Sequence, residues 1–439
     1  MPKISLGYNI EWNEKITLPA LTKTLQEKGL GKDALIALLQ ARNDELCDQL
    51  CGPKYKPDKS STFDRKGSKK RTLGTRFGII QLRLARLRNK LTNEWFFPIW
   101  SDIVIEPRKI FQLDIIGIMQ SGAQRMSYRN TKEEIGAVIL GEIPSPCTIN
   151  RRIKAIGPEL AQKIRDRELN ATTHQPDDTK LHSQDGGHHK IMIVLATSPN
   201  KRPRLRGFAV GKKWNADNFS LNKTTFRDGK GRYSPPTVVS DLEPGLADLF
   251  TPENGYWQPC KEHVVRDVGH FLWNDGLKMG EDKRRYMGFI SGILEHLKSS
   301  VRKHIPLGEF DAVEHRIKQT TKELRRRATM FQDLGYYTTA EYLRRASNTV
   351  TTFAALALKG IEIPCDNNVL ERVMGEVSKR CKHKWMSWTT EGAEALLILL
   401  LVRTIEPDTY EKFWNRKLYG AEKPLPGFGI SFISLETAC

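Results

Sequence analysis

Three acidic residues far apart in the chain have the chemistry of a metal-binding carboxylate set. Asp177 opens a segment with strand-like alternation, Asp241 ends the apolar segment TVVS, and Glu371 comes early in a helix-like segment. Carboxylates are the hard oxygen ligands that Mg²⁺ prefers. Two such ions can stabilise both the attacking and the leaving oxygen when a phosphodiester bond is cut or joined. Asp178 stands beside Asp177, and because strand side chains alternate, only one of the two can face such a site. Each carboxylate taken singly has a commoner interpretation, as a turn residue, a helix cap or a surface residue.

The segments around the first two carboxylates predict a mixed sheet. Residues 177–184 and 188–196 are strand-like segments on either side of the turn Asp185-Gly186-Gly187, a pattern that predicts a β-hairpin. Residues 205–210 supply a third strand, and residues 236–240 a fourth that ends at Asp241. A helix follows, so we predict strands with helices packed on them.

A long helical stretch separates Asp241 from Glu371. Charged residues at helical spacing dominate residues 276–359, which we predict to be an all-α insertion. The α/β catalytic domain then covers residues 171–275 and 360–410. Its last helix contains the apolar run Leu396–Val402, which is too short to span a bilayer and predicts a buried helix.

Residues 104–170 predict a helix-turn-helix DNA-binding domain. Thr131 begins a Thr-x-x-Glu capping box, and the short helix after it stops at Gly141. Ser145 then caps a second helix with Pro146 in its first turn. Such a helix presents polar and basic residues to a major groove, although a helical hairpin with a solvated basic face would look similar. The outward residues are Thr148, Asn150, Arg151, Arg152 and Lys154.

The N-terminal and C-terminal regions carry less information. Residues 1–52 predict a helical region with apolar spacing over residues 18–50, and residues 53–103 a basic linker followed by a β-hairpin. Within this part, the Lys- and Arg-rich residues 54–76 predict a flexible arm, and residues 73–87 a half-buried strand pair. Residues 411–439 are a predicted tail.

The composition favours a polyanionic partner. The 439-residue chain has 70 Lys and Arg against 51 Asp and Glu, a net charge of +19, and a pI of about 9.5. Enzymes of small neutral metabolites do not need this excess, whereas DNA-binding proteins do. A basic or ribosome-associated protein without DNA chemistry is the alternative.

The cysteines and the N-terminus indicate a cytoplasmic location. Seven scattered cysteines are an odd number in a large chain and predict reduced thiols. The first residues lack the continuous apolar core of an export signal, and we expect no membrane partner.

Four segments, taken in order, resemble the DDE transposases of insertion sequences related to the Mutator superfamily. They are PDDTKLHS, TVVSDLEPGLADLF, CKEHVVRDVGHFL and NNVLERVMGEVSKR, and the resemblance covers residues 176–403. It implies a ribonuclease H-like fold with a helical insertion between the second Asp and the Glu. The matching residues are Asp177, Asp241 and Glu371 as catalytic and metal ligands, with Cys260, His263 and Asn368 as accompanying motif residues.

The resemblance also favours one of the two neighbouring Asp residues, although the sequence leaves both open, and it implies an activity. Its Asp-x-Thr setting favours Asp177 over Asp178. It implies two Mg²⁺ or Mn²⁺ ions, cleavage at the terminal inverted repeats of the element, and joining to target DNA. Two ends must meet, so we expect a homodimer or larger assembly in the prokaryotic cytoplasm, associated with the nucleoid.

Two further groups of residues lie near the third carboxylate or between it and the second. Cys260 and His263 have metal-ligand spacing, but no second pair stands out, so a packing role is favoured over zinc. Basic residues after Glu371 could hold the phosphates of the cut strand, and a solvated helix face is an equal alternative. We expect the nearby Trp385 and Trp388 in the core. The basic residues are Lys379, Arg380 and Lys382, with His383 and Lys384.

Two other functions remain open from the sequence. One is a ribonuclease H-like metal-dependent nuclease or resolvase that cuts DNA without strand transfer. The other is a domesticated DNA-binding protein that has lost catalysis.

Overall fold

A computed structural model of the chain describes most of its residues, and the account below is confined to them. The described residues are 30–75, 77–101, 109–111, 113–139, 143–214, 223–227, 234–242, 246–251, 254–278, 280–382 and 386–419. The chain divides into two compact units: Met1–Ile153 with Trp414–Cys439, and Lys154–Phe413. Within the described ranges, no helix is both long and apolar enough to cross a membrane.

The first unit contains a helix on a small antiparallel sheet. Helix α2 (Leu30–Cys51) packs on the hairpin β1 (Phe63–Thr75) and β2 (Gly78–Asn89), and the short β3 (Trp95–Phe96) pairs with β2 before the 3₁₀ turn η1 (Pro98–Ser101). The predicted hairpin is confirmed, but its first strand begins well before residue 73. Residues 18–29 of the predicted helix lie outside the described residues.

The predicted flexible arm over residues 54–76 is wrong for residues 63–75. The side chains of Lys69 and Lys70 stay exposed, while the backbone of this segment pairs with β2, whose Leu82 and Leu84 are buried. The composition predicts disorder because the segment has few apolar residues of its own. The paired strand β2 supplies the buried apolar side chains that hold the hairpin in the fold.

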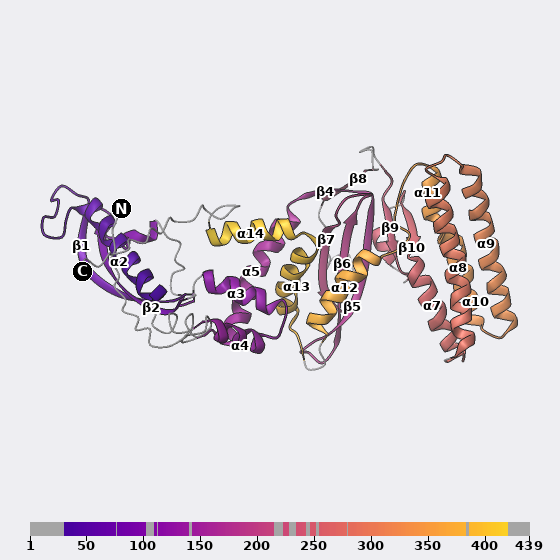
Figure 1. Cartoon of the computed structure of the whole chain (residues 1–439), viewed down its shortest axis with the longest axis horizontal. Coiled ribbons are helices and arrows are strands. Elements are labelled where there is room, and N and C mark those ends of the chain that lie inside the picture. The colour runs from indigo at the N-terminus through magenta and orange to yellow at the C-terminus, as the bar shows by residue number, and fades with distance from the viewer. Residues whose placement is uncertain are drawn as a thin grey trace, which may run out of the picture. The chain divides into compact units, whose positions relative to one another are not determined.

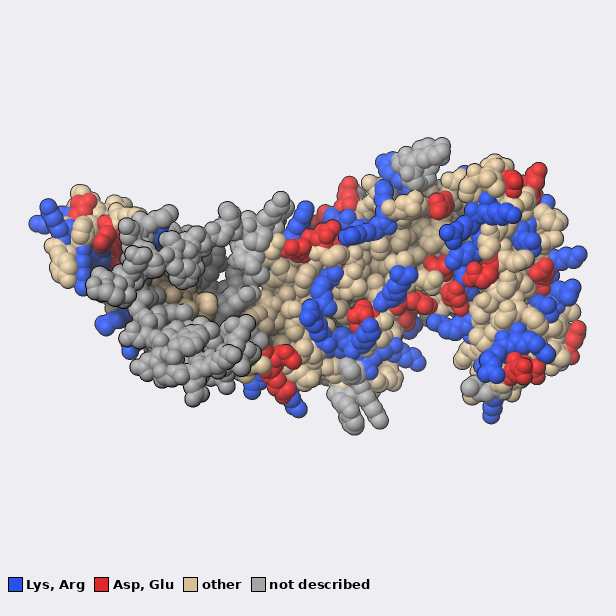
Figure 2. Space-filling model, in the orientation of Figure 1, with Lys and Arg blue, Asp and Glu red and all other residues tan. Residues whose placement is uncertain are grey.

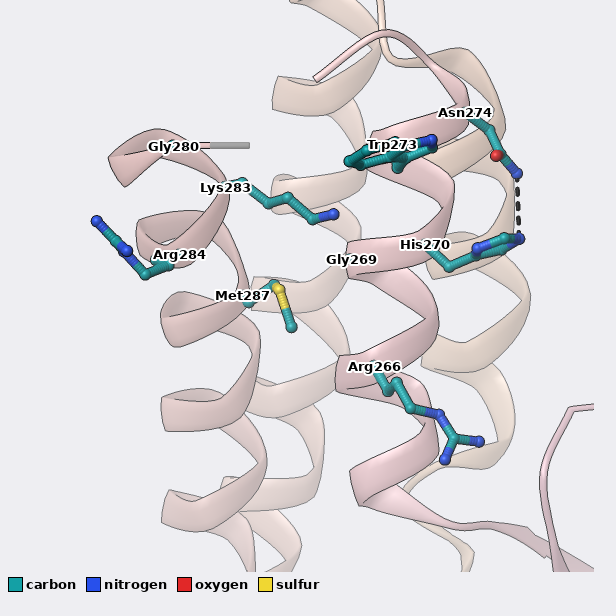
Figure 3. Close-up of a pocket in the computed structure, with 9 residues that line it drawn as sticks. All are labelled: Arg266, Gly269, His270, Trp273, Asn274, Gly280, Lys283, Arg284 and Met287. Atoms are coloured by element: carbon teal, nitrogen blue, oxygen red, sulfur yellow. Dashed lines mark hydrogen bonds between the residues drawn. The ribbon is translucent and has the colours of Figure 1, made fainter. Parts of the chain in front are cut away.

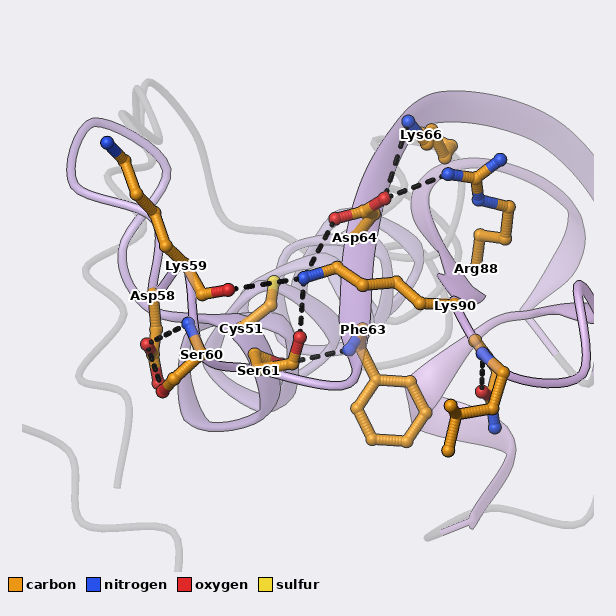
Figure 4. A network of polar contacts seen from close by, with 12 residues as sticks. Cys51, Asp58, Lys59, Ser60, Ser61, Phe63, Asp64, Lys66, Arg88 and Lys90 are labelled. Carbon is orange, nitrogen blue, oxygen red and sulfur yellow. Dashed lines mark hydrogen bonds and ion pairs between the residues drawn. The ribbon is translucent and has the colours of Figure 1, made fainter.

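A polar network also fixes the turn before this hairpin (Figure 4). Asp64 accepts from Arg88 at 3.0 Å and lies 3.5 Å from both Lys66 and Lys90. Lys90 donates in turn to the backbone carbonyl of Ser61 at 2.5 Å. The loop is therefore held to the end of β2.

Three helices follow in the region predicted as helix-turn-helix: α3 (Leu113–Ala123), α4 (Tyr128–Val138) and α5 (Pro146–Arg165). The predicted cap of α4 is wrong. Ser127 caps the helix by accepting the backbone N–H of Asn130 at 3.1 Å, and Thr131 lies buried inside it. The predicted start of α5 is confirmed, since the Ser145 hydroxyl accepts the N–H of Thr148 at 3.2 Å.

The second unit is built on a five-stranded mixed sheet in the order β10-β9-β5-β6-β7 (Figure 1). The hairpin of β5 (Thr173–His182) and β6 (His188–Thr197) continues antiparallel into β7 (Arg204–Gly211). Strands β9 (Thr237–Ser240) and β10 (Tyr256–Pro259) run parallel to β5. The α/β prediction is confirmed, with the short β10 added.

A two-stranded parallel sheet accompanies the main sheet. It pairs β4 (Glu168–Ala171) with β8 (Lys223–Phe226), and neither strand was predicted. Both strands have four residues, too few for a clear alternation in the sequence.

Helices pack beside the sheet and across it. Helices α7 to α10 share one apolar core and form a helical body. This body begins earlier than the predicted insertion at residue 276, because Val264, Val268 and Leu272 of α7 are part of the core. Helix α12 contacts β5 and helix α13 contacts β7, and the predicted apolar run is buried in α13. The helices are α6 (Leu246–Phe250), α7 (Lys261–Asn274), α8 (Glu281–His304), α9 (Phe310–Asp333), α10 (Tyr337–Thr349), α11 (Thr352–Leu358), α12 (Asn368–Cys381), α13 (Thr390–Ile405) and α14 (Pro407–Tyr419).

Candidate active site

The sheet register brings the first two carboxylates to the same level. Strands β5 and β9 are parallel neighbours, and Thr173 pairs with Thr237. Asp177 and Asp241 each follow their paired residue by four positions along the chain. Parallel strands advance together, so Asp177, in the middle of β5, and Asp241, directly after the end of β9, lie at the same level of the sheet.

The neighbouring Asp177 and Asp178 separate onto opposite faces of β5. The carboxylate of Asp178 accepts from Lys190 Nζ at 2.8 Å and from the indole N–H of Trp214 at 2.7 Å. Asp177 instead accepts the backbone N–H of Asp178 at 2.8 Å and is close enough to Asp241 for the two charges to repel. The structure therefore pairs Asp177, and not Asp178, with Asp241.

The surroundings of Asp177 disfavour its charged form. Burial, together with the charges of Asp241 and Asp178, raises the pKa of this carboxyl to about 7, against the opposing effects of the Asp178 N–H and Arg266. Burial and like charge both penalise an ionised carboxylate, and a bound cation would relieve both.

We predict that Asp177→Asn stabilises the metal-free protein increasingly as pH rises. The folded-state pKa lies above the unfolded value, so the wild type loses stability between pH 4 and pH 7, whereas the amide does not. Thermal melting in EDTA should show a gap between the two proteins that widens from pH 5 to pH 7 and then levels off.

Asp178→Asn is the matched control for this melting experiment. It removes the same charge one residue away but also removes the ion pair with Lys190 and weakens the hydrogen bond from Trp214, so it should lower the melting temperature. Equal shifts for both variants would contradict the different environments of the two residues.

Glu371 reaches the site from the first turn of α12. Its carboxylate lies 3.4 Å from Nε2 of His263 and 3.8 Å from the guanidinium of Arg266. Burial lowers the pKa of His263 to about 4, with the charge of Arg266 acting in the same direction. The imidazole is therefore neutral near pH 7 and can donate its Nε2–H to Glu371.

Cys260 and His263 hold the start of α7 against the site. The N–H of Cys260 donates to the Ser240 carbonyl at 2.6 Å, and its thiol accepts the N–H of Asn367 at 3.3 Å. Burial raises the pKa of the Cys260 thiol to about 11, whereas a zinc ligand must be a thiolate. These contacts join the end of β9 to the beginning of α12 and favour the packing role expected from the sequence.

The predicted Asn368 is the first residue of α12 and its side chain is exposed. The preceding Asn367 is fully buried instead, at the N-cap position. Sequence reasoning also missed Arg266, which interacts with both Glu371 and Asp177. Its spacing of three residues after His263, on the same helix, was the available signal.

The carboxylates fit a hard divalent ion by their chemistry, although they do not form a closed cage. In the part of the chain that the structure describes, no three His, Cys, Asp or Glu side chains are close enough to hold one ion. Asp177 and Asp241 repel each other, and Arg266 interacts with both Asp177 and Glu371. The repulsion between the two carboxylates would attract a divalent cation, whereas the positive charge of Arg266 opposes one.

The residues predicted to bind DNA from α5 have different environments. Arg151 is exposed, and Thr148 and Asn150 are partly exposed. The prediction for Arg152 is wrong: it is buried and donates to the Phe111 carbonyl at 2.8 Å. Lys154 forms an ion pair with Glu391 at 2.7 Å.

The basic residues after Glu371 are partly exposed and partly buried. Lys379 is exposed and pairs with Glu376 at 2.6 Å, and Lys382 is exposed. The predicted outward position of Arg380 is wrong, because its guanidinium is buried 5.0 Å from the Trp388 ring. The core position of Trp388 is confirmed. The neighbouring predictions for His383, Lys384 and Trp385 lie outside the described residues.

Comparison with known proteins adds no family to this geometry. No protein-family model matches the chain, and no curated protein matches it significantly.

Proposed function

We propose that the protein is a DDE-type DNA transposase with a ribonuclease H-like catalytic domain. The observation that carries the proposal is the common level of Asp177 and Asp241 on adjacent parallel strands, with Arg266 linking that pair to Glu371. The mixed sheet and the helical body between the second and third carboxylates support the same proposal.

In this proposal the three carboxylates hold two Mg²⁺ or Mn²⁺ ions. Such ions supply an activated attacking oxygen and stabilise the leaving oxygen of a phosphodiester exchange. The neutral His263 orients Glu371 through its Nε2–H, and Cys260 holds the start of the helix that carries Glu371. Arg266, about two-thirds exposed, places a permanent positive charge where the DNA phosphate must approach.

The proposed DNA contacts lie on exposed cations. Figure 2 shows Lys and Arg side chains gathered over the region where Figure 1 places α12. Lys379 on α12 and Lys382 directly after it are both exposed. Phosphate contacts of this kind supply affinity without base specificity. Reading of the terminal inverted repeats is assigned to α5, through Arg151 with Thr148 and Asn150.

The reaction products test this function. Purified protein is incubated with Mg²⁺, DNA from both flanks of its gene, and a supercoiled target plasmid. Flank DNA joined to the plasmid is the expected result. Cleavage without joining would instead identify a nuclease or resolvase, and binding without either would identify a non-catalytic DNA-binding protein.

The neighbours Arg151 and Arg152 provide a matched pair for the DNA-binding proposal. Arg151→Ala should weaken binding to the flank DNA by about tenfold, in line with the loss of one arginine contact, and leave stability unchanged. Arg152→Ala should cost about 1–3 kcal/mol of stability, because it removes a buried donor to Phe111. Fluorescence anisotropy and urea unfolding separate the two effects, and equal DNA affinity for wild type and Arg151→Ala would contradict the assignment.

A further inference from the structure

Arg266 on α7 interacts with carboxylates of two different groups. Its Nη1 is 3.8 Å from Oε1 of Glu371, and its charge also acts on the buried carboxyl of Asp177. Its Nε is 4.0 Å from Oδ1 of Asp267, the next residue of the helix. One guanidinium is therefore shared between two carboxylates of the candidate active site and a third carboxylate that is not part of it.

Asp267 is held in place by the helical body. The hydroxyl of Tyr342 on α10 donates to Oδ2 of Asp267 at 3.0 Å, which leaves Oδ1 for Arg266. Burial, together with the charge of Asp267, raises the pKa of Tyr342, so this hydroxyl keeps its proton. The Tyr342 ring is buried in the core of the body, with its centre 4.7 Å from that of Phe271. Asp267 is therefore a fixed second partner for Arg266.

Glu371 has another neighbour on α7 besides Arg266. The buried His263 approaches the same oxygen, Oε1, with its Nε2 at 3.4 Å. This imidazole is neutral near pH 7, so it orients the carboxylate without neutralising its charge. Glu371 therefore stays in place when the guanidinium leaves.

The Arg266 side chain can change partners without moving a helix. It is 63% exposed, and both of its ion pairs are long. Exposed ion pairs contribute little net free energy, so little is lost when one is broken. The side chain also lines an open pocket of about 630 Å³ between α7 and α8, and Figure 3 shows its guanidinium directed away from α8.

A guanidinium and a divalent cation compete for the same carboxylates. Both are attracted by Glu371 and Asp177, and like charges repel strongly at distances of a few ångströms. A guanidinium keeps its charge at every physiological pH, so Arg266 cannot relieve this conflict by losing a proton. The conflict is relieved only when the side chain moves to another anion.

We propose that Arg266 is an internal counter-ion that occupies the cation position of the candidate active site until DNA binds. In the metal-free protein it neutralises Glu371 and Asp177. A DNA phosphate then draws the guanidinium away, Asp267 remains its partner on α7, and the carboxylates become free for a divalent ion. Metal binding and DNA binding therefore strengthen each other. The inference rests on the proposed function in taking these carboxylates as metal ligands and DNA as the substrate.

Metal binding without DNA tests the competition. Mn²⁺ is titrated into the DNA-free full chain, and free Mn²⁺ is measured by electron paramagnetic resonance. Arg266→Gln should bind Mn²⁺ about tenfold more tightly than wild type, whereas Arg266→Lys keeps the charge and should stay close to wild type. Arg284→Gln removes a cation that lines the same pocket from α8 and should change nothing. Adding Asp177→Asn to Arg266→Gln should abolish the gain.

Asp267 distinguishes an exchange of partners from a general effect of charge. Asp267→Asn weakens the second partner but still accepts from Tyr342, so Arg266 should hold Glu371 more firmly and Mn²⁺ should bind more weakly. The same change made in Arg266→Gln should have a clearly smaller effect. Equal effects in the two backgrounds would mean that Asp267 acts only through its own charge, and would contradict the exchange.

DNA affinity tests the coupling. Fluorescence anisotropy with flank DNA, in EDTA and in saturating Ca²⁺, gives the factor by which a divalent ion strengthens DNA binding. Because coupling between two ligands is reciprocal, this factor should be about tenfold larger in wild type than in Arg266→Gln. Arg284→Gln should leave the factor unchanged.

Three results would overturn the counter-ion assignment. They are equal Mn²⁺ affinity of wild type and Arg266→Gln, an equal gain from Arg284→Gln, and the same Ca²⁺ factor in wild type and Arg266→Gln. Each would leave the transposase proposal standing, because DNA joining is measured separately. If wild type, Arg266→Gln and Asp177→Asn all failed to bind Mn²⁺, the counter-ion assignment and the transposase proposal would both be wrong.

Discussion

Asp177→Asn and Asp241→Asn should each reduce Mg²⁺-dependent DNA cleavage and joining by about 10³-fold or more. Either change removes a carboxylate from the pair that the parallel register of β5 and β9 brings together. Metal ions contribute several kcal/mol of transition-state stabilisation, and about 1.36 kcal/mol corresponds to a factor of ten in rate. The measurement is the initial rate of product formation from labelled flank DNA at saturating Mg²⁺.

Asp178→Asn is the decisive control for this prediction. It makes the same chemical change at the adjacent residue, whose carboxylate binds Lys190 and Trp214 on the opposite face of β5. Its rate should stay within about tenfold of wild type once its lower stability is taken into account. If Asp178→Asn were inactive and Asp177→Asn active, the assignment of the first ligand would be reversed.

Misfolding cannot account for inactivity of Asp177→Asn if this variant melts at a higher temperature than wild type. The raised pKa of Asp177 predicts that increase in metal-free buffer above pH 7. An inactive but stabilised protein is the expected combination.

Glu406→Ala should have the largest effect on stability, a loss of about 3–5 kcal/mol. Glu406 is buried after α13 and binds Arg167 through both carboxylate oxygens. It also accepts from Arg204 at 2.7 Å and from the N–H of Leu205 at 2.8 Å. Removal leaves the partly buried Arg167 without its anion and releases β7 from the helix. Urea unfolding followed by circular dichroism measures the change.

The pH dependence of stability provides a second test of Glu406. Burial alone would raise its pKa, but the hydrogen bonds and charge of Arg167, with Leu205 and Arg204, outweigh burial and lower it. Its contribution is therefore complete above the ordinary pKa of a glutamate and is lost as pH falls through the lowered value. Glu406→Ala should lack this acid-dependent loss. Glu411→Ala, on the exposed side of α14, should change stability by less than about 0.5 kcal/mol, and a similar effect of the two variants would contradict this role.

Sequence patterns predicted the elements of the second unit well, because local periodicity records which face of a strand or helix is buried. The β5–β6 hairpin, the apolar strand before Asp241 and the apolar α13 were all recognised in this way. The arm before residue 76 was misjudged for the opposite reason. Its apolar partners are on β2, and no pattern within the arm itself shows them.

Exposure of individual cations was the least predictable part of the sites. Arg152 and Arg380 have the same chemistry as their exposed neighbours Arg151 and Lys379, but they are buried. Arg152 reaches the carbonyl of Phe111, and Arg380 lies by the ring of Trp388. Both partners depend on packing between separate segments, which helical spacing alone does not specify.

The sequence by itself determined the three carboxylates, their order, and the helical stretch between the second and third. Only the tertiary structure decided that Asp177 and not Asp178 pairs with Asp241, and that Arg266 joins this pair to Glu371. The physical reason is that strand register and helix docking set which side chains meet across long sequence separations. Local residue patterns set only the face from which each side chain projects.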